Sequence, residues 1–343
     1  MLRRKPQSPA LGEAEIAELL APLAHAKGLL LAVSGGPDST ALLIMAALWA
    51  AAPGRPRVEV ATIDHGLRPE AAREALAVGE HARRRGLKHH VIQWRGPKPS
   101  SRVQERAREA RYRLLAERAR HIGADHIVTA HHADDQSETV LFRLLRGSGL
   151  SGLKGMERLV ERGGVRLARP LLGLAKADLV AFCKAHGESF VEDPSNVDPR
   201  FARTRLRRLT ARLGEEGFGA AEIARLARRA ARMEEAVVRA TRVAEERLKW
   251  RAGDGRYDAK ALFEEPQEIA LRLLAGAIAS IAGVKPRRIR LEQIETIGEK
   301  LRQAQERGEA FATTLAGVSL RLSAKGVLSI GKAAPRRQKA VGG

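Results

Sequence analysis

The sequence contains little cysteine and few aromatic residues, and it has no long apolar segment. Cys183 is the only cysteine among 343 residues, so neither an internal disulfide nor an all-cysteine metal site can form. Aromatic residues make up 3% of the chain, so aliphatic side chains must build the core. No stretch of about 18 apolar residues is present, and the basic segment 1–10 lacks an apolar signal core. These absences predict a cytoplasmic protein without a membrane span.

Charge of one sign is in large excess. The formal net charge is +21. Such an excess favours a polyanionic partner, because each neutralised phosphate releases bound counterions. Arginine-rich composition also arises from GC-rich coding, and the heavy use of alanine, arginine and glycine fits that alternative. Composition therefore favours a nucleic-acid partner without establishing one.

Short aliphatic runs alternate with helical patterns over the first 192 residues. The predicted strands cover residues 29–33, 58–63, 90–94 and 126–129, with a further short strand within 165–172. The predicted helices cover residues 39–52, 70–85, 102–121, 135–146 and 176–186. This alternation predicts an α/β fold of Rossmann-like type, in which a parallel sheet carries helices on both faces.

The pattern changes after about residue 215. Helical periodicity covers residues 220–248, 268–281 and 291–305, and residues 317–330 read as a hairpin. We therefore expect a catalytic domain over 1–212 and a smaller, mainly helical domain over 213–332. The basic residues 333–343 are expected to form a disordered tail.

A glycine-rich loop connects the first predicted strand to the first helix. It consists of Ser34, Gly35, Gly36, Pro37, Asp38, Ser39 and Thr40. Glycines allow a ligand to approach the backbone closely, and the N-terminus of a helix attracts phosphate. Asp38 could hold Mg²⁺ beside that phosphate, because Mg²⁺ prefers carboxylate and phosphate oxygens. The alternative is a plain strand–helix turn in which Asp38 caps the helix.

Two further polar clusters follow predicted strands. Asp64 and His65 follow the second strand, where an ordinary turn with a solvated histidine is the alternative. The fourth strand precedes the cluster His131, His132, Asp134, Asp135 and Glu138. Adjacent carboxylates repel one another unless a cation or a shared proton offsets them, and a Mg²⁺–ATP site would supply the cation. His132, Asp134 and Asp135 could also handle protons. A capping pair formed by Asp135 and Glu138 and a zinc site at His132 are the alternatives.

Arginine-rich segments offer contacts for a nucleic-acid backbone. Residues 200–212 contain six arginines and no acidic residue, which is unusual for a solvated helix face. Arg146 precedes a glycine-rich stretch, where a solvated arginine at the end of a helix is the alternative. The candidate backbone contacts are Arg108, Arg111, Arg146, Arg203, Arg205 and Arg207.

These motifs resemble known enzymes. The loop at residues 34–39 resembles the PP-loop of N-type ATP pyrophosphatases. Residues 129–156, followed by 169–172 and 192–196, closely resemble the tRNA(Ile)-lysidine synthetases, and the resemblance extends over roughly residues 29–208. The family departs from this sequence at Gln104, where glutamate is frequent, and at Thr204, where asparagine is usual.

The resemblance implies a ligase that forms a carbon–nitrogen bond. In that family ATP adenylates the C2 oxygen of the wobble cytidine in isoleucine tRNA with a CAU anticodon, and L-lysine then displaces AMP. By the resemblance, residues 34–40 with Asp64 and His65 bind ATP, and Asp38 holds Mg²⁺. The catalytic residues that it implies are Asp38, His132, Asp134, Asp135 and Glu138. The six arginines above would then contact tRNA.

Three alternatives remain at this stage. A tRNA thiolase with a PP-loop commonly needs paired cysteines or an iron–sulfur cluster, which the single Cys183 cannot supply. An amide-forming PP-loop ligase often carries a glutaminase domain, for which this sequence has no segment. A non-catalytic RNA-binding protein would have no need of the intact acidic cluster. The sequence gives no oligomeric state and leaves a homodimer open.

Overall fold

The protein folds into two compact units. A computed structural model describes residues 11–64, 66, 70–94, 103–191, 202–250, 255–284 and 289–334. The first unit comprises Met1–Arg146 and Lys154–Ala227, and the second comprises Gly147–Leu153 and Arg228–Gly343. The chain therefore enters the second unit twice: briefly over Gly147–Leu153, and finally at Arg228, inside a long helix.

A six-stranded sheet forms the centre of the first unit. Its order is β3-β2-β1-β4-β6-β5, and all neighbouring pairs are parallel except β5 with β6. The strands are β1 (Leu29–Ala32), β2 (Val58–Asp64), β3 (Lys88–Gln93), β4 (His126–Thr129), β5 (Leu159–Arg162) and β6 (Val165–Ala168). The predicted parallel α/β sheet is confirmed, and the antiparallel edge strand β5 was not predicted.

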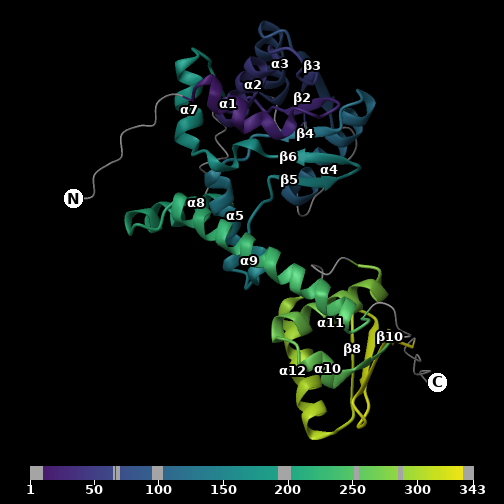
Figure 1. Ribbon diagram of the computed structural model, residues 1–343. Coiled ribbons are helices and arrows are strands. Elements are labelled where there is room, and N and C mark those ends of the chain that lie inside the picture. The colour runs from purple at the N-terminus through teal and green to yellow at the C-terminus, as the bar shows by residue number, and fades with distance from the viewer. Residues whose placement is uncertain are drawn as a thin grey trace, which may run out of the picture. The chain divides into compact units, whose positions relative to one another are not determined.

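Helices cover both faces of this sheet (Figure 1). The helical elements of the first unit include α1 (Glu13–Leu20), the 3-10 turn η1 (Ala21–Leu23), α2 (Pro37–Ala50), α3 (Glu70–Arg84), α4 (Val103–His121), α5 (Ala133–Leu144), the 3-10 turn η2 (Pro170–Gly173), α7 (Lys176–Ala185) and α8 (Ala202–Glu215), which packs on α5. Successive residues of a strand point to opposite faces. Leu29 and Leu31 accordingly pack with α1, α2 and α7, whereas Leu30 and Ala32 pack with α4. The near-continuous aliphatic run of β1 is thus buried on both sides.

Helix α2 is buried around most of its circumference, because its sequence is almost wholly apolar. Leu42 and Leu43 are inaccessible to solvent, and Pro37 occupies the first turn, where its missing N–H leaves no hydrogen bond unmade. The Cys183 thiol of α7 donates a hydrogen bond to the Pro37 carbonyl at 3.3 Å. Burial, reinforced by nearby carboxylates, raises the pKa of Cys183 to about 11, so this thiol packs rather than reacts. The start of α2 is therefore rigidly held.

The second unit has its own core and its own sheet. The four-stranded antiparallel sheet has the order β7-β10-β9-β8, and α11 and α12 pack on it. The elements are α6 (Leu150–Leu153), most of α9 (Ala220–Arg247), β7 (Arg256–Asp258), α10 (Ala259–Phe263), α11 (Gln267–Ala282), α12 (Leu291–Arg307), β8 (Phe311–Leu315), β9 (Val318–Leu322) and β10 (Val327–Lys332). The predicted hairpin is β9–β10, and two further strands extend it.

The chain passes from the first unit to the second between Ala227 and Arg228, inside α9. The predicted domain boundary at 212/213 falls within α8, which packs on α5 of the first unit. Of the predicted tail over residues 333–343, only residues 333 and 334 lie within the described part of the chain. Over the described ranges, no helix is both long and apolar enough to cross a membrane.

Candidate functional site

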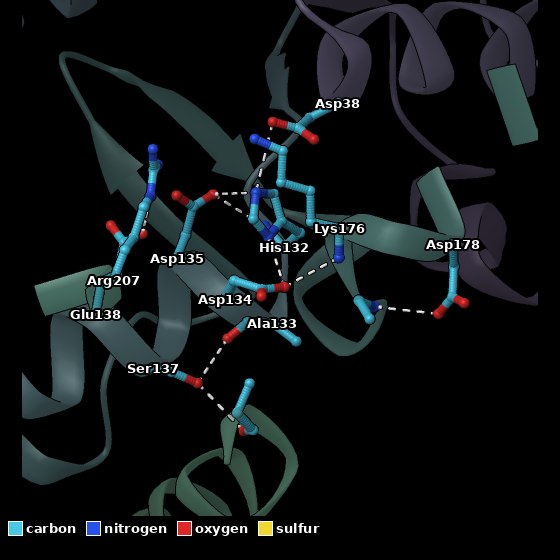
Figure 2. Close-up of polar contacts among 12 residues, drawn as sticks. Asp38, His132, Ala133, Asp134, Asp135, Ser137, Glu138, Lys176, Asp178 and Arg207 are labelled. Atoms are coloured by element: carbon cyan, nitrogen blue, oxygen red, sulfur yellow. Dashed lines mark hydrogen bonds and ion pairs between the residues drawn. The ribbon is translucent and has the colours of Figure 1, made fainter. Parts of the chain in front are cut away.

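The predicted clusters meet where β1 and β4 end. These strands are parallel neighbours, with Ala32 opposite Thr129, so the segments that follow them leave the sheet side by side. The glycine loop follows β1 and opens α2, and His132 follows β4 as the N-cap of α5. Ligands of open α/β sheets gather at this edge. Figure 2 shows Asp38 and the acidic start of α5 turned toward the same histidine.

The glycine loop is held in shape by hydrogen bonds within itself. Gly35 has φ +89°, a left-handed conformation that favours glycine. The Ser39 hydroxyl donates to the Gly36 carbonyl at 3.0 Å and accepts from the Ser34 N–H at 3.2 Å. Thr40 Oγ1 donates to the Gly35 carbonyl at 3.4 Å. The loop therefore presents the N-terminus of α2, with its positive dipole, to the edge of the sheet.

His132 lies at the centre of three carboxylates. Its Nε2 is 3.5 Å from Asp38 Oδ2 and 3.4 Å from Asp135 Oδ2, and its Nδ1 is 3.3 Å from Asp134 Oδ2. The side chain is 2% exposed. Burial by itself would lower the pKa of His132, but Asp134, Asp38 and Asp135 together outweigh burial and raise it to about 10. The ring is therefore an imidazolium at neutral pH.

Backbone groups fix two of these carboxylates. Asp134 Oδ2 accepts from the Lys176 N–H at the start of α7, at 2.9 Å. Asp135 Oδ2 accepts from the His132 N–H at 3.2 Å, which makes His132 and Asp135 the capping pair of α5. The alternative that paired Asp135 with Glu138 for capping is therefore wrong, because Glu138 lies one turn further along the helix. Capping accounts for one carboxylate of the cluster and leaves the others to be explained.

Glu138 forms an ion pair with Arg207 of α8. Arg207 Nε lies 2.6 Å from Glu138 Oε1, and the glutamate side chain is 4% exposed. Burial lowers the pKa of Arg207, but Glu138, followed by Asp135 and Asp38, raises it overall. The structure thus brings Arg207, predicted as a tRNA contact, against α5, and its contact with tRNA stays a prediction.

The donors at this site fit Mg²⁺ only as part of a shared coordination shell. Asp38 Oδ1 is buried and has no hydrogen-bond partner, which suits an oxygen ligand of a cation. Across the described part of the chain, no group of three or more histidine, cysteine or acidic residues could hold a metal ion. Mg²⁺ typically takes one or two carboxylates and completes its shell with phosphate oxygens and water. Asp38 fits that role, and the zinc alternative at His132 finds no ligand set.

The remaining predicted residues are more scattered. Asp64 ends β2, and its Oδ1 accepts from the Gly66 N–H at 2.9 Å. Arg146 stacks on Phe142 with its Cζ 4.2 Å from the ring centroid. Exposed positions on α4 and α8 are occupied by Arg108, Arg111 and Arg205. Outside the described residues lie His65 and the side chain of Arg203. The roles of all these residues stay predictions.

The sequence did not indicate the structural roles of two buried residues of α5. The Gln136 amide donates to the Met156 carbonyl at 3.0 Å and accepts from the Met156 N–H at 2.7 Å. The Ser137 hydroxyl donates to the carbonyls of Ala133 and Ala220. Both side chains bind the backbone of segments distant in sequence. Their presence beside the acidic residues was the available signal, but their partners could not be read from the sequence.

Comparison with known proteins agrees with this geometry. Residues 11–213 match the family model of the PP-loop domain. The tRNA(Ile)-lysidine synthase of Methylobacterium nodulans is 50% identical over 316 residues, covering 91% of this chain and 92% of the relative. That of Bradyrhizobium diazoefficiens is 45% identical, covering 95% of each chain. The solved structure of a U34-tRNA thiolase from Methanococcus maripaludis shares the fold, with a TM-score of 0.55 and 14% identity, over 63% of this chain and 77% of that one. The chain therefore belongs to the tRNA(Ile)-lysidine synthase family and carries that family's PP-loop domain.

Proposed function

We propose that this protein joins L-lysine to the wobble cytidine of isoleucine tRNA with a CAU anticodon, and converts ATP to AMP and pyrophosphate. The observation that carries the proposal is the cluster of Asp38, Asp134 and Asp135 around a protonated His132, directly beside the PP-loop, to which Asp38 itself belongs. Family membership supplies the substrates, since the relatives are tRNA(Ile)-lysidine synthases.

In the first step the cytidine C2 oxygen attacks the α-phosphorus of ATP. The bond from that phosphorus to the bridging oxygen of pyrophosphate breaks, and pyrophosphate leaves. The N-terminus of α2 would face the phosphates, and the hydroxyls of Ser39 and Thr40 lie in the same turn. Bound Mg²⁺ would neutralise phosphate charge, with Asp38 as its protein ligand. Adenylation turns a poor leaving group into a good one.

In the second step an amino group of lysine attacks C2, and AMP departs with the former C2 oxygen. The attacking amine must be neutral, so a base has to accept its proton. His132 already carries a proton at neutral pH, which leaves Asp135 or Asp134 as the base. The imidazolium instead places a positive charge beside the negative charge that develops on the departing phosphate.

Transfer of labelled lysine tests the proposal directly. We expect label to enter isoleucine tRNA with a CAU anticodon only when ATP is present, with one AMP and one pyrophosphate released per lysine. The same tRNA with uridine at the wobble position is the matched control and should take up no label. Absence of lysine transfer to the CAU tRNA, with ATP consumed or not, would overturn the proposal.

Asp38→Asn should lower kcat/KM for lysine transfer by about 10²–10³-fold, because it removes the anionic ligand facing the phosphates. The fold should survive, since the amide occupies nearly the same volume. Asp178→Asn on α7 is the control, because Asp178 only caps its own helix through the Ala175 N–H at 3.3 Å. Equal activities of the two variants, measured at saturating lysine, would remove Asp38 from the mechanism.

A further inference from the structure

Three guanidinium groups surround one tyrosine on the face of the sheet that carries α4. Tyr112 of α4 is 4% exposed and packs in the core beneath that helix. Arg162, at the end of β5, has its Cζ 4.1 Å from the centroid of the Tyr112 ring, and Arg108 has its Cζ 5.4 Å from the same centroid. Arg169, which follows β6, is 6% exposed and interacts with the Tyr112 hydroxyl. Figure 1 shows α4 beside β5 and β6.

This cluster has an excess of positive charge. Arg113, the residue after Tyr112 on α4, pairs with Glu117 at 3.0 Å, as surface arginines of this protein often do. No carboxylate among the described side chains forms an ion pair with Arg108, Arg162 or Arg169.

Arg169 shows the consequence of this excess most clearly. Its Nη1 donates to the Glu157 carbonyl at 2.6 Å, whereas its Nε is buried without a hydrogen-bond partner. Burial lowers the pKa of Arg169; Tyr112 opposes this effect, whereas the neighbouring Arg108 and Arg162 add to it. Buried charges in folded proteins are normally paired. A bound anion beside Tyr112 would supply a counter-charge for these guanidinium groups.

The surroundings indicate which anion would fit. Arg108 and Arg162 are exposed, so the ligand approaches from solvent. The planar guanidinium group of arginine matches the oxygens of a phosphate. Stacking on Tyr112 holds the guanidinium groups of Arg108 and Arg162 in place before a ligand binds. Tyr112 packs in the core on one face of the sheet, whereas α2 and its glycine loop pack on the other, so this phosphate is not one of those of ATP.

We propose that Arg108 and Arg162, stacked on Tyr112 and backed by Arg169, form a binding site for a backbone phosphate of the tRNA substrate. The proposal rests on the proposed function, which makes tRNA the partner. It assigns to β5 and β6 a part in RNA binding, whereas the arginine patterns of the sequence predict RNA contacts only on helices and beside the glycine-rich stretch after Arg146.

The salt dependence of tRNA binding tests the site. The slope of log Kd against log salt concentration reports the number of phosphates neutralised, with about 0.7–0.9 per contact. Binding of the CAU isoleucine tRNA is measured without ATP or lysine, so that catalysis plays no part. Arg162→Gln should reduce the slope by part of one contact, because Arg108 still faces the same phosphate, and should weaken binding several-fold at low salt. Arg113→Gln, which removes a paired arginine from α4, is the matched control and should leave the slope unchanged.

A double-mutant cycle then asks whether the two exposed arginines hold one phosphate. Arg108→Gln and Arg162→Gln together should weaken binding less than the product of their separate effects, because they share a partner. An unchanged slope for Arg162→Gln, or a slope lowered equally by Arg113→Gln, overturns the site. A raised KM for lysine with unchanged tRNA binding also overturns it and assigns the anion to lysine's carboxylate. Failure of the wild-type protein to bind this tRNA at all would instead overturn the proposed function.

Discussion

The side chain of His132 shows how one residue acquires its chemistry from its neighbours. In isolation a buried histidine is neutral at pH 7, because burial disfavours the charged form. Asp38, Asp134 and Asp135 reverse that preference, since each lies within 3.5 Å of a ring nitrogen. The positive charge of the imidazolium in turn offsets part of the repulsion among the three carboxylates. The charged forms of His132 and of these carboxylates therefore stabilise one another.

This dependence predicts the titration of His132 in the nucleotide-free, metal-free protein. The pKa of His132 is raised to about 10, so the folded state should keep the ring protonated up to that pH. Asp134→Asn should lower the pKa, because the interaction of the ring with Asp134 is the largest single one that raises it. Histidine side-chain NMR measures both values. A wild-type ring that titrates near pH 6.5 would contradict the geometry.

At the scale of elements, α5 organises the site through successive side chains. Gln136 binds the backbone of Met156, Ser137 binds the carbonyl of Ala220, and Glu138 pairs with Arg207. Three segments distant in sequence are thus attached to the helix that carries Asp134 and Asp135. A displacement of any of them would move the carboxylates.

The turn at Gly155 shows how closely these segments fit. Gly155 has φ +70°, and a Cβ there would lie 2.7 Å from the Gln136 amide. Gly155→Ala should lower the free energy of unfolding by about 2–4 kcal/mol, through backbone strain and overpacking together. Gly123→Ala is the control, because Gly123 has φ +72° but open space around it, and should cost only about 1–2 kcal/mol. Equal losses in urea unfolding would refute the close contact with Gln136.

A second set of contacts joins α3 to the segment after α7. Glu188 is 10% exposed and accepts from Arg85 Nη2 at 2.5 Å and from Arg84 Nη2 at 3.2 Å, and one of its carboxylate oxygens lies 2.8 Å from His81 Nδ1. The Val191 N–H, three residues later, donates to the Gly35 carbonyl at 2.9 Å. The glycine loop is therefore supported from α3 through Glu188.

Stability should follow the protonation of Glu188. Burial by itself would raise the pKa of Glu188, but Arg85, His81 and Arg84 lower it overall. A lowered native pKa adds stability that is complete above the ordinary value of 4.5 and disappears as the pH falls through the native value. Glu188→Gln should therefore cost about 2 kcal/mol at pH 7 and progressively less in acid.

Thermal unfolding between pH 7 and pH 3 measures this difference. Glu80→Gln is the control, because Glu80 pairs with Arg83 on the exposed side of α3 and its loss should cost less than about 0.5 kcal/mol. A Glu188→Gln penalty that is the same at every pH would show that the carboxylate charge is not involved.

What the sequence could predict follows from the range of the interactions. The β1 strand and the loop at Gly35 are encoded locally, by an aliphatic run and by glycine conformations, and both were predicted correctly. The strand β5 is short and mostly exposed, so no apolar pattern marked it. The ion pair between Glu138 and Arg207 joins residues 69 positions apart, and only the fold brings them together.

At the scale of the whole molecule, the described residues of the two units form separate hydrophobic cores. In the first unit Leu115 of α4 is inaccessible to solvent, and in the second unit Leu273 of α11 is equally buried. The Trp250 Nε1 donates to the Leu273 carbonyl at 2.9 Å within the second core. Because neither core shares its buried residues with the other, each unit should be able to lose stability without the other.

Leu273→Ala tests this independence. Removal of a fully buried leucine side chain typically costs about 2–5 kcal/mol, because a cavity remains. Hydrogen exchange, followed by mass spectrometry, should show faster exchange in α11, β9 and β10, and unchanged exchange in β1 and α2. Leu115→Ala should give the reverse pattern. ATP binding should survive Leu273→Ala, since the glycine loop belongs to the first unit. Equal loss of protection in both units after either substitution would show that they unfold as one cooperative body.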